Sequence, residues 1–231
     1  MRTAHRAAYE AVLAAAQSLI AAGLTAGTSG NVSARCDDGP IVITPTSLPY
    51  DQMTTDDLVL LSPDGERLAG ESTPSSEAAL HLACYRAFAE IGSVLHCHPA
   101  YATMFACARQ PVPPVIDEAL LFVGGEVAVA EYAMSGTPEV GENAVRVLGE
   151  TGSALLASHG MVTVAASPGA ALHQAGVVEH CAKVAWGARA LGGHVPIPTA
   201  AADRLGQVYR TARHRHRGPD GWAGVTDSAS R

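Results

Sequence analysis

Short β-prone runs alternate with longer helical segments along this chain, and the connections between the runs are short. Apolar residues repeat at helical spacing over residues 3–22 and stop at Gly23, a typical helix C-terminus. Three β-prone runs follow at 31–36, 40–44 and 58–62, separated by turn residues. Because such turns are too short for right-handed crossovers, they indicate neighbouring antiparallel strands. The chain is therefore predicted to be an α/β protein with a mainly antiparallel sheet.

The same alternation continues to the C-terminal region. A second helix is predicted to open at Thr73-Pro74, with Thr73 as its N-cap and Pro74 at its first position. Further helices are predicted at 101–109, 138–148 and 168–191, and further strands at 94–98, 127–132, 154–158 and 161–165. Residues 1–213 are predicted to form one domain, because no change in composition divides them. Residues 214–231 have little to bury and are expected to form a loose tail.

Charge and cysteine content limit the partners and the compartment. A formal net charge of -7 excludes a general attraction to nucleic acid or to an anionic membrane surface. No apolar run approaches the roughly 18 residues that a membrane span needs. The five cysteines form no CxxC pair, and their odd number leaves one unpaired in any intrachain scheme. We therefore expect a cytoplasmic protein whose cysteines act as small core residues.

Two histidines lie two residues apart on a predicted strand, in the sequence His96-Cys97-His98. Alternate strand residues share a face, so both imidazoles point to one side and Cys97 points away. Such a pair is a common metal chelator, although a structural pair has the same pattern. His159, in a turn between two predicted strands, can supply a third ligand, with Gly160 letting the backbone bend. The other seven histidines, His81 among them, have no converging partner in the sequence and are interpreted as surface or core residues.

Three small-residue segments can hold an anion. Residues 27–33 and 44–47 offer backbone N–H groups and hydroxyls, and Ser75-Ser76 adds two hydroxyls at the predicted helix start. Flexible turns and helix caps explain the same residues without a ligand. Glu77 follows directly, and its place in the first helical turn aims its carboxylate inward. The sequence thus predicts a carboxylate beside a possible phosphate cradle.

Taken in order, these motifs resemble the class II aldolase/adducin-like family, and within it the L-fuculose-1-phosphate aldolases. The resemblance implies a three-layer α/β/α sandwich, a homotetramer with active sites at subunit contacts, and a small phosphorylated sugar as substrate. It also implies a zinc ion, or another divalent metal ion, held by Glu77, His96, His98 and His159. By the same resemblance, the substrate phosphate is held by Gly30, Asn31, Thr46, Ser75 and Ser76, with Ser47 beside them.

The chain departs from the family pattern at three positions. Ser47 stands where the aldolases usually have glycine, so either the loop shifts or the hydroxyl contributes a hydrogen bond. Glu118 falls where the bacterial fuculose-phosphate aldolases carry an acid/base tyrosine. A carboxylate can also move a proton, although its ordinary pKa of roughly 4.3 is far below the roughly 10 of tyrosine, so Glu118 is either catalytic or a surface charge. Tyr209 lies about a turn before the place of the family's C-terminal tyrosine, which reaches a neighbouring subunit.

The implied activity is that of a metal-dependent aldehyde-lyase, which cleaves a ketose 1-phosphate to dihydroxyacetone phosphate and a small aldehyde. Glu77 is expected to carry the proton at C3, and Glu118 the proton of the C4 hydroxyl. A methylthioribulose-1-phosphate-type dehydratase shares the glutamate at 118 but lacks Ser75-Ser76-Glu77. A sugar-acid-phosphate decarboxylase also stays open. Phe122 replaces the aspartate of the ribulose-phosphate 4-epimerases, which disfavours epimerase activity. The adducin heads, which are non-enzymatic interaction modules, lack the metal ligands that this chain has, so that role is disfavoured as well.

Overall fold

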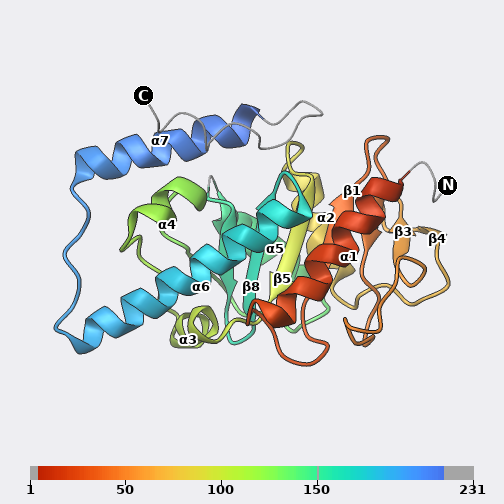
Figure 1. The fold of residues 1–231 in the computed structure, drawn as a ribbon, viewed down its shortest axis with the longest axis horizontal. Coiled ribbons are helices and arrows are strands. Elements are labelled where there is room, and N and C mark those ends of the chain that lie inside the picture. The colour runs from red at the N-terminus through yellow and green to blue at the C-terminus, as the bar shows by residue number, and fades with distance from the viewer. Residues whose placement is uncertain (1–4, 150, 216–231) are drawn as a thin grey trace.

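The computed structural model describes residues 5–149 and 151–215. Within these residues, one eight-stranded sheet forms the centre, in the order β4-β3-β2-β1-β5-β8-β7-β6 (Figure 1). The strands are β1 (Asn31–Arg35), β2 (Ile41–Ile43), β3 (Val59–Leu61), β4 (Arg67–Ala69), β5 (Ser93–Cys97), β6 (Val129–Ala130), β7 (Ser153–Leu156) and β8 (Gly160–Ala165). Neighbours are antiparallel except β6 and β7, which are parallel. The predicted mainly antiparallel sheet is confirmed.

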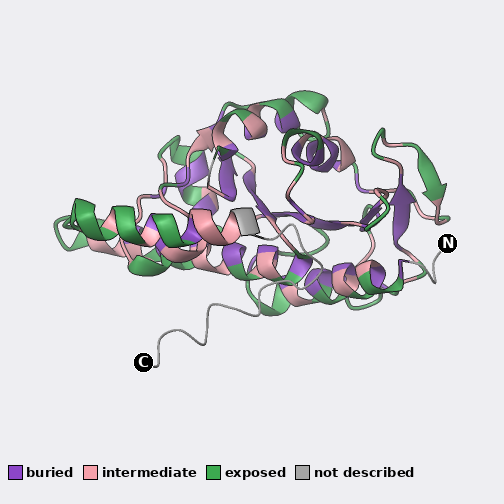
Figure 2. Ribbon diagram, turned by 90° about the horizontal axis from the view of Figure 1, so that it is seen from above, coloured by how far each residue is buried: buried purple, intermediate pink, exposed green. Residues whose placement is uncertain are grey.

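Helices cover both faces of this sheet. They are α1 (Arg6–Ala21), α2 (Ala78–Ala87), α3 (Ala100–Ala108), α4 (Asp117–Phe122), α5 (Pro138–Leu148), α6 (Pro168–Ala190) and α7 (Thr199–Arg215). Figure 2 shows the buried strands between two helical layers. One layer contains α2 and α5, and the other contains α1, α3 and α6. The three-layer α/β/α sandwich is therefore confirmed.

The alternation of side chains along the central strands divides the core into two halves. In β5, Leu95 and Cys97 pack with the α1 and α6 layer. Val94 faces the α2 and α5 layer, together with Val162 of β8. His96 is in phase with Val94, so its ring lies on the α2 side of the sheet and Cys97 lies on the other side. This is the division between His96 and Cys97 that the sequence predicts.

The predicted start of the second helix is wrong. Helix α2 begins at Ala78, with Glu77 at its N-cap position. Thr73-Pro74 is instead extended, because Pro74 forms an antiparallel bridge with Pro45. The Thr46 N–H donates to the Thr73 carbonyl, and the Ser75 N–H donates to the carbonyl of Thr44. Tertiary pairing therefore overrides the local helix signal and brings two of the predicted anion-binding segments side by side.

Three other expectations concern the chain as a whole. Helix α7 continues to Arg215, so it includes the first two residues of the predicted tail, and residues 216–231 lie outside the described part. All five cysteines lie in the described part and are unpaired, but Cys107 is exposed and not a core residue as expected. None of the described helices is long and apolar enough to cross a membrane.

Candidate metal and phosphate site

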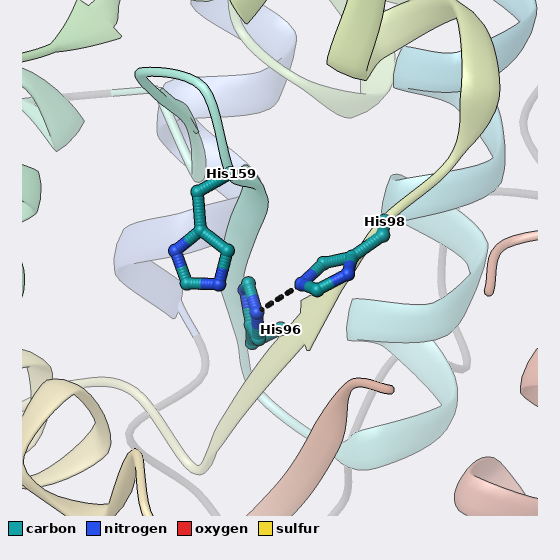
Figure 3. A group of neighbouring side chains, drawn as sticks. All are labelled: His96, His98 and His159. Carbon is teal, nitrogen blue, oxygen red and sulfur yellow. Dashed lines mark hydrogen bonds between the residues drawn. The ribbon is translucent and has the colours of Figure 1, made fainter. Parts of the chain in front are cut away.

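Three histidine rings meet at one end of the central strands. His96 belongs to β5, His98 directly follows that strand, and His159 lies in the turn before β8. Figure 3 shows the three rings pointing toward one another, with ring centroids 4.6 to 5.0 Å apart. The Nε2 atoms of His96 and His98 are 2.8 Å apart. One ligand nitrogen from each ring lies within 4.8 Å of the others.

The carboxylate of Glu77, at the N-cap position of α2, completes this cluster. Its Oε2 lies 3.0 Å from Nε2 of His96, and its Oε1 lies 3.3 Å from Nε2 of His159. The Nδ1–H of His96 donates to the carbonyl of Met161 on β8 at 2.9 Å, so Nε2 is the ring nitrogen that faces the cluster and, in the neutral ring, has a lone pair for a cation. A backbone partner on the second nitrogen is the usual support of a metal-binding histidine. Imidazole nitrogens with one carboxylate form a donor set that suits zinc.

Burial and neighbouring charges shift the pKa values of these side chains. Burial raises the pKa of Glu77, but the hydrogen bond and positive charge of His96, with Asn31 and His159, outweigh it and hold that pKa well below its usual range. Burial, together with positive charge on His96 and His159, lowers the pKa of His98 to about 4. Burial and His96 also lower the pKa of His159. Near neutral pH, the cluster therefore presents an ionised carboxylate and unprotonated rings at His98 and His159.

The turn that carries His159 is built differently from the sequence interpretation. Gly160 does not adopt a left-handed conformation; Ser158 does, with φ 54°. The reason for glycine at 160 is close approach. A Cβ atom there would lie 2.5 Å from both the carbonyl oxygen of Cys97 and the Cδ2 atom of His98. Gly160 therefore lets β8 approach β5 closely enough to bring His159 beside His98.

The candidate phosphate residues lie on adjoining loops. Thr46, Ser47 and Ser76 are exposed, whereas Ser75 is buried and its Oγ accepts the N–H of Glu77 at 3.2 Å. Ser47 has φ 59°, a left-handed conformation that glycine adopts more readily. The loop thus keeps a glycine-type backbone although the residue is serine. Gly30 also needs to be glycine, because its φ is 90° and a Cβ would lie 2.8 Å from the carbonyl oxygen of His96.

Residues 10–186 match the Class II Aldolase and Adducin N-terminal domain family. The chain belongs to this family. It is 31% identical over 201 residues to the 5-deoxy-D-ribulose 1-phosphate aldolase of Bacillus thuringiensis serovar kurstaki, with 87% of this chain and 94% of that protein covered. A 5-methylthioribulose-1-phosphate/5-deoxyribulose-1-phosphate aldolase of Rhodospirillum rubrum is 29% identical over 197 residues, covering 85% of this chain and 88% of that protein.

The fold comparison agrees with the family assignment. A solved structure of an L-fuculose 1-phosphate aldolase matches with a TM-score of 0.84 and 30% identity, covering 88% of this chain and 96% of that one. The predicted resemblance and the predicted enzyme class are confirmed, because the chain belongs to this family and these three relatives are aldolases, which are lyases. Class II aldolases depend on a metal ion, and the His cluster is a possible place for one.

Two of the residues considered in the sequence for the active site, Glu118 and Tyr209, do not lie in the three-histidine cluster. Glu118 is exposed at the start of α4, and within residues 5–149 and 151–215 it takes no part in the ion pairs and hydrogen bonds of Glu77 in the cluster. Tyr209 is buried within its own chain, where its ring lies against Gly124 and its hydroxyl lies close to Gly152.

Two residues at the site were missed in the sequence. The Ser135 hydroxyl donates to Oε1 of Glu77 at 2.9 Å from the loop before α5. His81, which we interpreted as lacking a partner, is fully buried and bonded to Asn31, which in turn donates to Oε2 of Glu77 at 3.1 Å. The spacing of four residues between Glu77 and His81 was the available signal, because such residues share one helix face. For Ser135 the sequence offers no comparable signal.

A second group of possible ligands lies elsewhere, at His5, Cys36 and Asp38. His5 Nε2 is 3.3 Å from the largely exposed Asp38 carboxylate, which makes an ion pair when the histidine is protonated. Cys36 packs in the hydrophobic core, and burial, with Asp38 and Asp37, raises the pKa of its thiol to about 11. A protonated thiol is a poor metal ligand. The histidine cluster at Glu77 is therefore the better candidate for a metal site.

Proposed function

We propose that this chain cleaves a ketose 1-phosphate into dihydroxyacetone phosphate and a small aldehyde, with a divalent metal ion, zinc by preference, on His96, His98, His159 and Glu77. The observation that carries the proposal is the convergence of three imidazoles and one carboxylate beside two hydroxyl-rich loops. The names of the three relatives described above, which are aldolases of sugar 1-phosphates, support the same reaction.

The donor set and its surroundings fit a divalent ion. His96 is fully buried and held by a backbone carbonyl, so its Nε2 is oriented before any ion binds. Glu77 is held on both oxygens, by Asn31 and by Ser135. When bound, the metal ion supplies positive charge that stabilises the negative oxygen of the intermediate by several kcal/mol.

The proton transfers fall to side chains of the protein. When the C3–C4 bond breaks, the C4 hydroxyl loses its proton and C4 becomes the aldehyde. The electron pair remains on C3 and spreads onto the C2 oxygen as an enediolate. Glu77 is ionised at rest, so it takes up a proton from solvent and delivers that proton to C3, which completes dihydroxyacetone phosphate. Glu77 suits this role because it is the carboxylate at the centre of the cluster.

The phosphate is assigned to the loops beside α2. Thr46, Ser47 and Ser76 present exposed hydroxyls there, and Gly30 and Ser75 shape the backbone around them. Asn31 connects these loops to the cluster, because it begins β1 directly after Gly30 and bonds to Glu77. A phosphate held at this place fixes the sugar carbons relative to the carboxylate, which lowers the entropic cost of reaction.

The proton of the C4 hydroxyl is assigned to Glu118 of an adjacent copy of the chain, in a cytoplasmic homotetramer. Support comes from the exposure of Glu118 on α4. It also comes from the separation of Glu118 from the cluster of its own chain, which it neither adjoins in sequence nor contacts among the described residues. A Glu118→Gln variant is expected to lose most of its activity, whereas Glu126→Gln, at another exposed glutamate, keeps it. Full activity of Glu118→Gln would remove the residue from the mechanism.

The reaction is tested with zinc-loaded protein and two substrates, 5-deoxyribulose 1-phosphate and L-fuculose 1-phosphate. Dihydroxyacetone phosphate is followed by coupled reduction, and the aldehyde is identified as acetaldehyde or lactaldehyde. We expect dihydroxyacetone phosphate from at least one substrate, its loss on chelation and its return with zinc. Loss of water from the substrate without dihydroxyacetone phosphate would favour the dehydratase, and no reaction with either substrate would contradict the proposal.

A further inference from the structure

A chain of buried polar side chains leads from Glu77 into the core between β1 and α2. Asn31 and Ser33 point from β1, and His81 and Tyr85 point from α2. Four hydrogen bonds join them: Tyr85 to Ser33 at 2.9 Å, Ser33 to Nδ1 of His81 at 2.6 Å, Nε2 of His81 to Oδ1 of Asn31 at 2.6 Å, and Nδ2 of Asn31 to Oε2 of Glu77 at 3.1 Å. His81 and Ser33 are fully buried.

The chemistry of the groups fixes the direction of every bond. An ionised carboxylate only accepts, so the Asn31 amide must turn its NH₂ group to Glu77 and its oxygen to His81. That oxygen needs a donor, so His81 carries its proton on Nε2. A neutral ring then accepts at Nδ1, so the Ser33 hydroxyl donates there and accepts in turn from Tyr85. All four bonds therefore donate toward Glu77.

The surroundings keep His81 in this single state. Burial, with positive charge on His96, lowers the pKa of His81 to about 3 although Glu77 opposes that shift, so the ring is neutral at working pH. Burial also raises the pKa of the Tyr85 hydroxyl, which keeps its proton available. The ring is held from both sides, because Ser33 bonds one nitrogen and Asn31 the other.

Without His81, the buried oxygen of the Asn31 amide loses its donor, and only the contact with Glu77 still orients the amide. A flipped amide places its oxygen against Oε2 of Glu77, which replaces an attraction with a repulsion between two acceptors. Oε2 is also the oxygen that faces His96, so the same atom belongs to the cluster and to the buried chain. The orientation of one amide therefore determines how Glu77 is held.

We propose that His81 is a positioning residue for Glu77: through its Nε2–H it fixes the amide of Asn31, which then holds the Glu77 carboxylate in place for proton transfer. The role rests on the proposed function, in which Glu77 carries the C3 proton. The two side-chain hydrogen bonds of His81 go to Ser33 and Asn31, and neither goes to the three-histidine cluster or to the exposed hydroxyls of the phosphate loops. Its effect is therefore expected on turnover and not on substrate binding.

Two variants and one control test this role. His81→Leu removes both hydrogen bonds at similar volume, whereas His81→Gln keeps one donor and one acceptor on a planar group. Gln174→Leu is the matched control, because Gln174 is also buried and donates to Ser153, at the end of β7 away from His159. Each variant is measured for kcat, KM, zinc content and thermal stability.

We expect kcat of His81→Leu to fall roughly 10- to 100-fold, as for a lost hydrogen bond to a charged group, with KM and zinc content within about twofold of wild type. His81→Gln recovers most of kcat, and Gln174→Leu loses stability but keeps kcat. An unchanged kcat in His81→Leu, or equal losses in the Leu and Gln variants, would overturn the role.

The tautomer gives a readout that does not depend on activity. Nitrogen-15 spectra of zinc-loaded protein, assigned with the His81→Gln variant, are expected to show His81 protonated on Nε2 alone. Protonation on Nδ1 would overturn the proposal even if the aldolase reaction is confirmed. Conversely, a wild-type chain that releases no dihydroxyacetone phosphate would contradict the proposed function, while the tautomer would still decide the orientation of Asn31.

Discussion

Replacing Gly160 by alanine is expected to weaken metal binding without unfolding the protein. The added Cβ would lie 2.5 Å from the carbonyl oxygen of Cys97 and 2.5 Å from Cδ2 of His98. Carbon atoms in contact normally lie about 3.5–4.0 Å apart, so the His98 ring must shift by about 1 Å. The backbone oxygen of Cys97 yields less easily, because β5 and β8 pair at Cys97 and Met161.

The size of the effect follows from this shift. Overpacking of this kind costs about 1–3 kcal/mol, and a misplaced ligand lowers metal affinity about 10- to 100-fold. The zinc dissociation constant is measured by competition with a chromophoric chelator, and the free energy of unfolding by urea denaturation of metal-free protein. Gly187→Ala is the control, because nothing lies within 4 Å of a Cβ at Gly187 in α6. Unchanged zinc affinity in a folded Gly160→Ala variant would refute the close approach of β8 to His98.

Two further results are expected. The metal-free protein loses stability as pH falls from about 6.5 toward 4, because burial lowers the pKa of His81 to about 3 and of His98 to about 4, so only the unfolded chain binds these protons. Below about pH 4.5, the lowered pKa of Glu77 adds a further loss of stability. A melting temperature of the metal-free protein that stays constant from pH 7 to 5 would contradict the lowered pKa values of the two histidines. Tyr209→Phe is expected to lower the free energy of unfolding by about 1 kcal/mol and to leave kcat unchanged, since Tyr209 packs inside its own chain; a large loss of kcat at wild-type stability would show that it reaches a catalytic site.

Much of the architecture can be predicted from local patterns in the sequence. Helix α5 has the bounds that Pro138 and the apolar spacing predict, and the alternation in β5 correctly puts His96 and Cys97 on opposite faces. These features depend on residues close in sequence. The start of helix α2 could not be predicted in this way. The bridge between Pro45 and Pro74 joins segments that are distant in sequence, so Pro74 is extended and the helix begins at Ala78.

The parts that sequence reasoning missed depend on tertiary contacts. Strand β4 is three residues long and largely exposed, so it has too few apolar positions for a pattern. His81 gains its meaning only when β1 brings Asn31 and Ser33 beside α2. The glycine at 160 is required by a neighbouring strand and not by its own backbone angles. Each of these features follows from packing between segments that are far apart along the chain.

The most direct test of the metal site is anomalous diffraction from crystals of the zinc-loaded protein, recorded on both sides of the zinc absorption edge. We expect one peak per chain, about 2.0–2.2 Å from Nε2 of His96, His98 and His159 and from an oxygen of Glu77. A peak at His5, Cys36 and Asp38, or no peak at the three-histidine cluster, would contradict it.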